Sequence, residues 1–205
     1  MILHNFIVFE GIDGAGTTTQ AKKLVDSLST AGVPVDADSE PTAGAVGRLI
    51  RSVLQGEESL EACSLALLFA ADRNEHLYAP QTGVIARIDR GRTVVSDRYV
   101  YSSLAYQGVS CDRELVDTAN AHFPSPGHVF YLDVPVSVCI ERISTRSRKE
   151  IFEKERFLEA VSVRYAQVLD RARKHGVAVH TLDGTASSEQ IAAQVWRTIR
   201  ETPIL

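Results

Sequence analysis

Residues 9–19 combine glycines and hydroxyl side chains at a spacing that suits phosphate binding. The pattern G-x-x-x-x-G-K-[ST] is met at Gly11, Gly16 and Thr18, but Thr17 stands in the place of the lysine. Glycines let backbone N–H groups turn toward phosphate oxygens, and a following helix adds its positive N-terminal end. An ordinary tight turn between a strand and a helix is the alternative. The residues expected to line the phosphate site are Gly11, Ile12, Asp13, Gly14, Ala15, Gly16, Thr17, Thr18 and Thr19.

A second polar pair, Asp97 and Arg98, directly follows the apolar run at 93–96. A carboxylate at the end of a strand can orient Mg²⁺ through water beside a phosphate, and the hydroxyl of Thr18 is the second expected ligand. The planar guanidinium of Arg98 can grip a phosphoryl group. A structural salt bridge between Asp97 and Arg98 is the alternative for this pair.

Two further pairs have the four-residue spacing that puts side chains on one face of a helix. Phe69 and Arg73 combine a ring that can stack on a base with a guanidinium that can bind its carbonyl or a phosphate. Ser103 and Gln107 are polar groups that suit the edge of a pyrimidine. A core phenylalanine beside a surface arginine explains the first pair equally well, and helix capping or solvent contacts explain the second.

The elements that must position these residues alternate between strands and helices, which predicts an α/β fold with a parallel sheet covered on both faces. Five strands are expected at 6–10, 33–38, 93–97, 129–134 and 177–182. Helices are expected at 17–31, 44–55, 59–79, 80–90, 99–107, 112–122, 136–146, 153–175 and 187–201. Ligands of such sheets collect outside the carboxyl ends of the strands, where the polar residues above fall.

Length and charge limit the function classes. A chain of 205 residues fits a single domain, 1–205, and a net charge of −4 argues against a partner that is a nucleic-acid polymer. Residues 142–174 nevertheless hold ten Arg or Lys and five Asp or Glu, which is either a functional basic segment or a solvated helix face. No run approaches the length of a membrane span, so we expect a cytoplasmic protein without a membrane partner.

The three cysteines have no metal-ligand spacing and lie in apolar or helical stretches. The sequence therefore predicts buried thiols in a reducing compartment at Cys63, Cys111 and Cys139.

Taken together, the motifs resemble the bacterial and archaeal thymidylate (dTMP) kinases. The resemblance extends from residue 6 to about residue 170, and its most specific part is Asp97-Arg98-Tyr99 followed by Ser-Ser-Leu-Ala-Tyr-Gln-Gly at 102–108. Further matches are the glycine loop, Glu40-Pro41, Ile50-Arg51, Leu-Phe-Ala-Ala-x-Arg at 68–73 and Phe-Tyr-Leu-Asp-Val at 130–134. The resemblance implies a P-loop nucleoside monophosphate kinase fold, dTMP and ATP as small-molecule partners, Mg²⁺ as cofactor and a homodimer packed through residues 44–90.

The resemblance also implies individual roles. Phe69 would stack on thymine, Arg73, Ser103 and Gln107 would read its polar edge, and Arg51 would lie close by. Asp13 would accept a hydrogen bond from the 3′-hydroxyl, and Tyr106 would crowd the 2′ position. Arg98 would hold the acceptor phosphate, Asp97 and Thr18 would surround Mg²⁺, and a basic lid at about 142–152 would close over ATP. The substrate-binding residues implied in this way are Asp13, Glu40, Arg51, Phe69, Arg73, Arg98, Ser103, Tyr106 and Gln107.

Two departures from the family pattern affect the catalytic charge. Thr17 replaces the lysine, and Ser39 precedes Glu40-Pro41 where the family commonly has arginine. The lid residues Arg146 and Arg148 are therefore the expected catalytic replacements, together with Lys149 as a further candidate. Two other interpretations stay open: a nucleotide-binding regulatory protein that catalyses poorly, and a related kinase with a different nucleotide or nucleoside acceptor.

Overall fold

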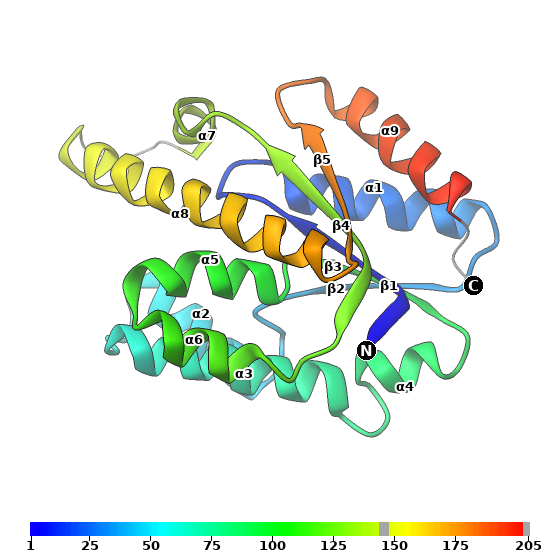
Figure 1. Ribbon diagram of the computed structural model, residues 1–205, viewed down its shortest axis with the longest axis horizontal. Coiled ribbons are helices and arrows are strands. Elements are labelled where there is room, and N and C mark those ends of the chain that lie inside the picture. The colour runs from blue at the N-terminus through cyan, green and yellow to red at the C-terminus, as the bar shows by residue number, and fades with distance from the viewer. Residues whose placement is uncertain (144–147, 203–205) are drawn as a thin grey trace.

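Five strands form one parallel sheet in the order β2-β3-β1-β4-β5 (Figure 1). The computed structural model describes residues 1–143 and 148–202, with side chains from residue 154 onward in the second range. The strands are β1 (Ile2–Glu10), β2 (Val35–Ser39), β3 (Thr93–Asp97), β4 (Ser125–Asp133) and β5 (Ala178–Asp183). The helices are α1 (Thr17–Thr30), α2 (Ala45–Gln55), α3 (Ala62–Tyr78), α4 (Val84–Ile88), α5 (Val100–Ser110), α6 (Arg113–Asn120), α7 (Val136–Ile143), α8 (Arg148–Lys174) and α9 (Ser188–Glu201).

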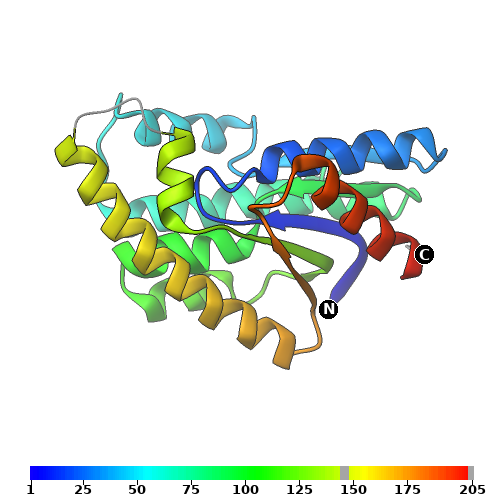
Figure 2. The ribbon, with the colours of Figure 1, turned by 90° about the horizontal axis from the view of Figure 1, so that it is seen from above.

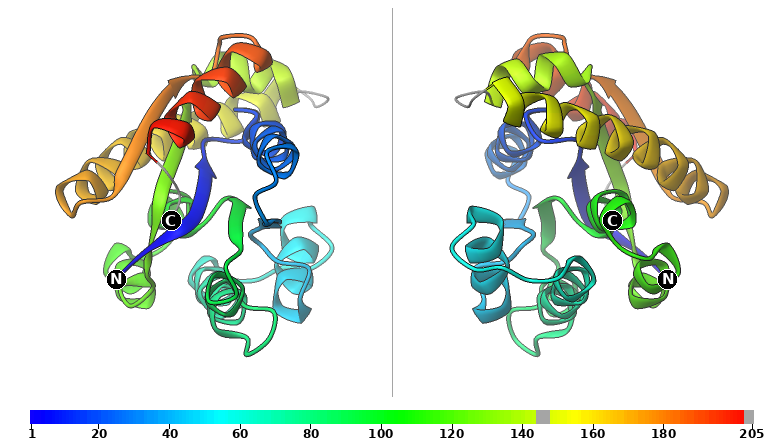
Figure 3. Two further views of the ribbon diagram at one scale, coloured as in Figure 1. Left: turned by 90° about the vertical axis from the view of Figure 1, so that its right-hand side faces the viewer. Right: turned by 90° about the vertical axis from the view of Figure 1, so that its left-hand side faces the viewer.

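Helices cover both faces of the sheet. Helices α1 and α9 pack beside each other on one face, whereas α5 packs against α8 on the opposite face and also contacts α3 and α6 (Figures 2 and 3). Because strand β1 is covered on both faces, its residues from Phe6 to Phe9 are completely buried, as a continuous apolar run predicts. The predicted fold class is confirmed.

The register of the strands places the last residues of β1, β2 and β3 side by side. Phe9 pairs with Asp97, and Asp97 pairs with Ser39 on its other side. The next residue of each strand or loop, namely Glu10, Arg98 and Glu40, therefore lies at the same edge of the sheet. The glycine loop, α7 and the start of α8 also gather at this end of the molecule (Figure 2).

All the predicted elements are present, and their bounds differ for local reasons. Strand β1 starts earlier than expected because Ile2 pairs with Ser125 of β4. Helix α3 starts at Ala62 because the carboxylate of Glu61 caps it, accepting hydrogen bonds from two backbone N–H groups. The expected helix at 80–90 shortens to α4, since the residue before Pro80 takes the extended conformation that proline favours.

One sequence-based prediction is wrong, because Cys63 and Cys111 form a disulfide instead of remaining free thiols. Their Cα atoms lie 5.1 Å apart, and the bond joins the start of α3 to the C-terminal cap of α5. Their 48-residue separation concealed this pairing in the sequence. Cys139 is a buried free thiol, as predicted.

A search of the described helices finds none with the length and apolar character needed to cross a membrane.

We expect the disulfide to stabilise the fold by reducing the conformational entropy of the unfolded chain. For a loop closed by residues 48 apart, the chain-entropy relation gives about 4 kcal/mol. Replacing both Cys63 and Cys111 with Ser should lower the free energy of unfolding by several kcal/mol, measured by urea denaturation. Dithiothreitol should destabilise the wild type and leave the double variant unchanged. Equal sensitivity of the two proteins would contradict this assignment.

Candidate active site

The glycine loop joins β1 to α1 and meets α7. Gly14 and Gly16 have φ angles of 88° and 98°, which favour glycine, and a Cβ on Gly14 would lie 2.7 Å from the carbonyl oxygen of Cys139. Arg142 of α7 donates hydrogen bonds to the carbonyls of Gly14 and Gly184, at 3.2 Å each. This contact connects the loop to the segment that follows β5.

Thr17, which takes the place of the lysine, is the first residue of α1 and is 5 % exposed. Its methyl carbon faces Gly11, 3.2 Å from the position that a Cβ would take there. Position 17 therefore brings neither a positive charge nor a long side chain to the loop. Any further cation near a bound phosphate must come from another segment.

Thr18 and Asp97 lie together, as predicted. The Thr18 hydroxyl donates a 2.5 Å hydrogen bond to Oδ2 of Asp97, whereas Oδ1 of Asp97 is buried without a hydrogen-bond partner in the described residues. Mg²⁺ prefers such oxygen ligands and commonly binds one or two carboxylates together with substrate phosphates. The orphaned Oδ1 and the adjacent hydroxyl therefore fit a magnesium site. No cluster of three or more His, Cys, Asp or Glu suited to a metal occurs in the described residues.

Arg98 bridges the glycine loop and the following helix rather than pairing with Asp97. Its Nη2 donates to Oδ1 of Asp13 at 2.9 Å, and its Nη1 donates to the carbonyl of Gly11 at 2.9 Å and to the hydroxyl of Ser102 at 3.1 Å. Its backbone has a φ of 75°, a conformation that costs a non-glycine residue about 1 kcal/mol or more. The alternative of a simple local Asp–Arg salt bridge is not supported.

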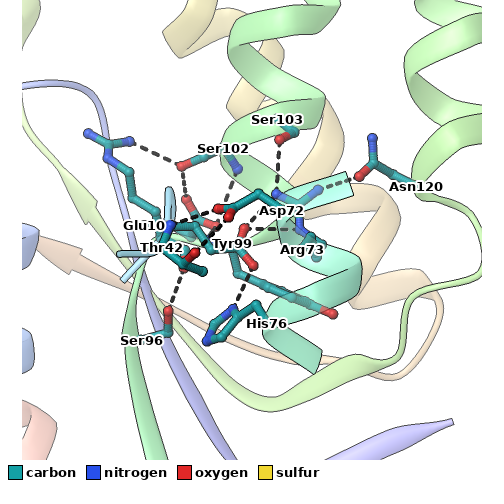
Figure 4. A network of polar contacts seen from close by, with 12 residues as sticks. Glu10, Thr42, Asp72, Arg73, His76, Ser96, Tyr99, Ser102, Ser103 and Asn120 are labelled. Atoms are coloured by element: carbon teal, nitrogen blue, oxygen red, sulfur yellow. Dashed lines mark hydrogen bonds and ion pairs between the residues drawn. The ribbon is translucent and has the colours of Figure 1, made fainter. Parts of the chain in front are cut away.

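The buried carboxyl group of Glu10 is connected to Arg98 through the hydroxyl of Ser102. Glu10 accepts a hydrogen bond from the hydroxyl of Ser102 at 2.6 Å (Figure 4). It accepts a second one from the hydroxyl of Tyr165 at 2.9 Å. Complete burial raises the pKa of Glu10 to about 7, although these hydrogen bonds and the charge of Arg98 lower it. Arg98 also reaches Tyr165, at 3.4 Å, so one network joins β1, α5 and α8.

A cavity of about 460 Å³ adjoins this network, which is a suitable volume for a small-molecule ligand. Arg73, on its wall, has no exposed surface, so the alternative of a surface arginine is wrong. Glu40 also lines the cavity, but its carboxylate is occupied by Arg73 and His76. All the sequence-predicted substrate-binding residues line this one cavity: Asp13, Glu40, Arg51, Phe69, Arg73, Arg98, Ser103, Tyr106 and Gln107.

Several of these residues are held by defined contacts. The Tyr106 hydroxyl donates to Oδ1 of Asp13 at 3.0 Å and accepts from the Asp13 N–H at 2.8 Å. Arg51 donates to the carbonyls of Pro41 and Thr42 and thus fixes the loop after β2. Ser103 accepts a hydrogen bond from Arg73 at 2.9 Å. The Ser103 hydroxyl therefore already has a partner as an acceptor. The side chain of Gln107, in contrast, has no hydrogen bond among the described residues.

The two predicted lid arginines cannot be placed. Arg146 lies outside the described residues, and Arg148 is described only as the first residue of α8.

Sequence reasoning missed several supporting residues. Glu10 could have been found, because an acid at the end of an otherwise apolar buried strand is a signal of a special environment. Tyr165, Asn120 and His76 gave no comparable signal, since each belongs to a helix distant in the sequence from the residue that it contacts.

A glycine loop between a parallel strand and a helix, beside a deep base-sized cavity lined by cations, defines a P-loop kinase of the nucleoside monophosphate type. The comparisons specify the family. A sequence model described as thymidylate kinase matches residues 9–195, and this chain belongs to the thymidylate kinase family. The predicted activity class, an ATP-dependent nucleoside monophosphate kinase, is thereby confirmed.

Individual relatives agree with the family assignment. A putative thymidylate kinase of Aeropyrum pernix is 45 % identical over 179 residues, which cover 87 % of this chain and 85 % of the relative. A putative thymidylate kinase of Treponema pallidum is 41 % identical, with 92 % and 90 % covered. The thymidylate kinase of Akkermansia muciniphila is 38 % identical, with 92 % and 88 % covered.

The Tyr165 hydroxyl should contribute to stability through its bonds with Glu10 and Ser102. Tyr165→Phe removes one of the two hydroxyl groups that donate to the buried Oε2 of Glu10, so the free energy of unfolding should fall by about 1–3 kcal/mol in urea denaturation. Tyr78 is 43 % exposed, and Tyr78→Phe is the matched control with a change within about 0.5 kcal/mol. Equal effects of the two substitutions would show that the buried network does not contribute as described.

Proposed function

We propose that this protein transfers the γ-phosphoryl group of ATP to dTMP and so forms dTDP and ADP. The observation that carries the proposal is that one cavity joins Phe69 and Arg73 to Arg98, which also bonds to the glycine loop. A pyrimidine in this cavity would have its phosphate directed toward the loop that binds the donor. Family membership supports the same reaction.

In the reaction, an oxygen of the acceptor phosphate forms a bond to the γ-phosphorus of ATP, and the bond to the bridging oxygen of ADP breaks. Both reactants are anions, so the protein must align them and neutralise developing charge. Arg98 holds the acceptor phosphate, and the N–H groups of the glycine loop and the start of α1 hold the donor phosphates. Thr18 and Asp97 would hold Mg²⁺, which would supply charge neutralisation at the phosphates.

The cavity walls are suited to recognise the nucleoside. Phe69 stacks on the base, while Arg73, Ser103 and Gln107 provide polar groups for its edge, with Arg51 close by. Asp13 accepts a hydrogen bond from the 3′-hydroxyl. The ring of Tyr106 is held by Asp13 and lies 5.4 Å from the Arg98 guanidinium carbon, so it occupies the space between sugar and phosphate sites. We assign Tyr106 the exclusion of a 2′-hydroxyl.

The acceptor preference tests this assignment. With dTMP, dUMP, UMP, dCMP and thymidine compared in a coupled assay of ADP release, kcat/KM should be highest for dTMP. Thymidine should be a poor acceptor because it lacks the phosphate that Arg98 binds, and UMP should be poor because of its 2′-hydroxyl. Equal rates with UMP and dUMP would rule out the role of Tyr106.

The charge absent at Thr17 comes, in our proposal, from the lid at about 142–152, through Arg146 and Arg148. Removing a charged donor to a transferring phosphoryl group costs on the order of 3 kcal/mol, a rate factor of about a hundred. The basic lid also excludes water from the site when it closes.

Kinetics of lid variants provide the check. Arg146→Ala and Arg148→Ala should each lower kcat for dTMP by about tenfold or more. Thr17→Lys in the Arg146→Ala background should restore part of the loss if both positions serve the same phosphates. A kcat within about twofold of wild type in both single variants would exclude the lid as the source of charge. Arg173→Ala, on a distant turn of α8, is the matched control.

The alternative of a regulatory nucleotide-binding protein is not favoured by the family assignment. A chain that only bound nucleotide would have no need of Thr18, Asp97 and Arg98 together with a complete base cavity. Absence of dTMP-dependent ADP release by the wild type would nevertheless favour it over catalysis.

We also propose one kinase domain, a homodimer and a cytoplasmic location. Helices α2 and α3 expose apolar side chains, including Leu54 at 59 % and Leu67 at 48 % exposure, and these suit an interface between two copies. Light scattering coupled to gel filtration measures the mass.

A further inference from the structure

A series of buried charged side chains leads from the base cavity to the edge strand β2. Glu40 binds Arg73 through Oε2, at 3.0 Å from Nε and 2.7 Å from Nη2. Its other oxygen, Oε1, lies 2.9 Å from Nδ1 of His76, and Nε2 of His76 lies 2.9 Å from Oδ2 of Asp38. Asp38 in turn accepts a hydrogen bond from Arg87 of α4. Figure 4 shows Arg73 and His76 on the same helix within this network.

The central member, His76, has a carboxylate oxygen at each ring nitrogen. A neutral imidazole can donate only one hydrogen bond, and its other nitrogen would place a lone pair against a carboxylate. The protonated ring donates to both Glu40 and Asp38, so the charges alternate in sign along the series from Arg73 to Arg87. The geometry therefore favours an imidazolium ion.

His76 is buried between an aromatic ring and charged side chains. Its side chain is 4 % exposed, and its ring meets the edge of Phe6 from β1 at a centroid distance of 6.4 Å. The charged groups facing it are Asp38 from β2 and Glu40 from the following loop, with Arg73 and Arg87 beyond them. Burial alone would lower the pKa of His76, but the hydrogen bonds with Asp38 and Glu40 raise it to about 9. The same bonds and Arg87 lower the pKa of Asp38 against the effect of burial.

The series determines how Arg73 is held. Besides Glu40, its guanidinium donates to Ser103 through Nη2 and to Asn120 through Nη1. Within the described residues these bonds use four of its five N–H groups, and the fifth, on Nη1, has no partner there. Arg73 lines the base cavity although only 1 % of its side chain is exposed. Asn120 and Ser103 are neutral, so Glu40 is the only charged partner of Arg73 in the described part of the chain. The orientation of the Glu40 carboxylate consequently sets the plane of the guanidinium.

We propose that His76 is a positioning residue for base recognition: by donating to both Asp38 and Glu40, it fixes the carboxylate that orients Arg73 at the polar edge of the pyrimidine. The inference rests on the proposed role of Arg73 toward the base. A guanidinium N–H matches the carbonyl at position 4 of thymine or uracil and mismatches the amino group of cytosine. His76 therefore contributes to the choice between these bases without contacting the substrate.

The first test compares His76→Gln with His175→Gln, a substitution of an exposed histidine in the turn that follows α8. In His76→Gln, KM for dTMP should rise by about tenfold, whereas kcat and KM for ATP stay within about threefold. The preference for dUMP over dCMP, which differ at position 4 of the base, should fall by about tenfold, since unpaired polar groups account for such discrimination. The His175→Gln control should match the wild type in every value.

The outcomes separate this inference from the proposed function. If the wild type shows no dTMP-dependent turnover, the proposed function fails. If the wild type turns over dTMP and His76→Gln keeps both its KM and its base preference, the role of His76 alone is overturned. A proportional loss with dUMP and dCMP would also overturn it, because a general loosening of the fold does not distinguish the bases.

A second measurement uses the wild type and requires no variant to fold. Nitrogen-15 NMR of the histidine rings should show both nitrogens of His76 protonated at pH 7.5, and a neutral tautomer would overturn the inference. As the pH rises through about 9, the ring should lose a proton and KM for dTMP should rise with it. A KM that stays constant while the ring titrates would equally contradict the proposed coupling.

Discussion

The site depends on two guanidinium groups at the carboxyl edge of the sheet, that of Arg73, which is fully buried, and that of Arg98, which is 21 % exposed. Removing a charged group from water costs several kcal/mol unless partners compensate for the lost hydration. Arg73, with 1 % of its side chain exposed, is compensated by Glu40, Ser103 and Asn120. Arg98 is compensated by Asp13, by the carbonyl of Gly11 and by the hydroxyls of Ser102 and Tyr165. The hydrogen bonds of these two guanidinium groups therefore hold several helices around the sheet in place relative to one another.

Each of these compensating networks joins several elements. Arg73 and its partners connect α3 with the loop after β2, with α5 and with α6. Glu10, Ser102 and Tyr165 connect β1 with α5 and α8. Tyr99 links the two, since its N–H donates to Glu10 at 3.0 Å and its ring lies 5.3 Å from the guanidinium carbon of Arg73. A change in the position of one of these side chains should consequently affect both the Arg73 network and the Glu10 network.

Much of this arrangement could be predicted from the sequence. The buried run of β1, the glycine spacing and the polar residues after each strand follow local rules, because a parallel sheet places the carboxyl ends of its strands at one edge. The partners of Arg73 and Arg98 could not be predicted in the same way. Asn120 is 47 residues from Arg73, and Tyr165 is 155 residues from Glu10, so no periodicity relates them. Predicting Cys63 and Cys111 as free failed for the same reason.

The disulfide has a further consequence for how a nucleotide reaches the base cavity. Helices α3 and α5, which present Phe69 and Gln107 to the cavity, are covalently joined near its rim by Cys63 and Cys111. The bond therefore limits how far these two walls can separate when a ligand enters. The cavity is also lined by Arg51 of α2 and Phe157 of α8, which the disulfide does not join.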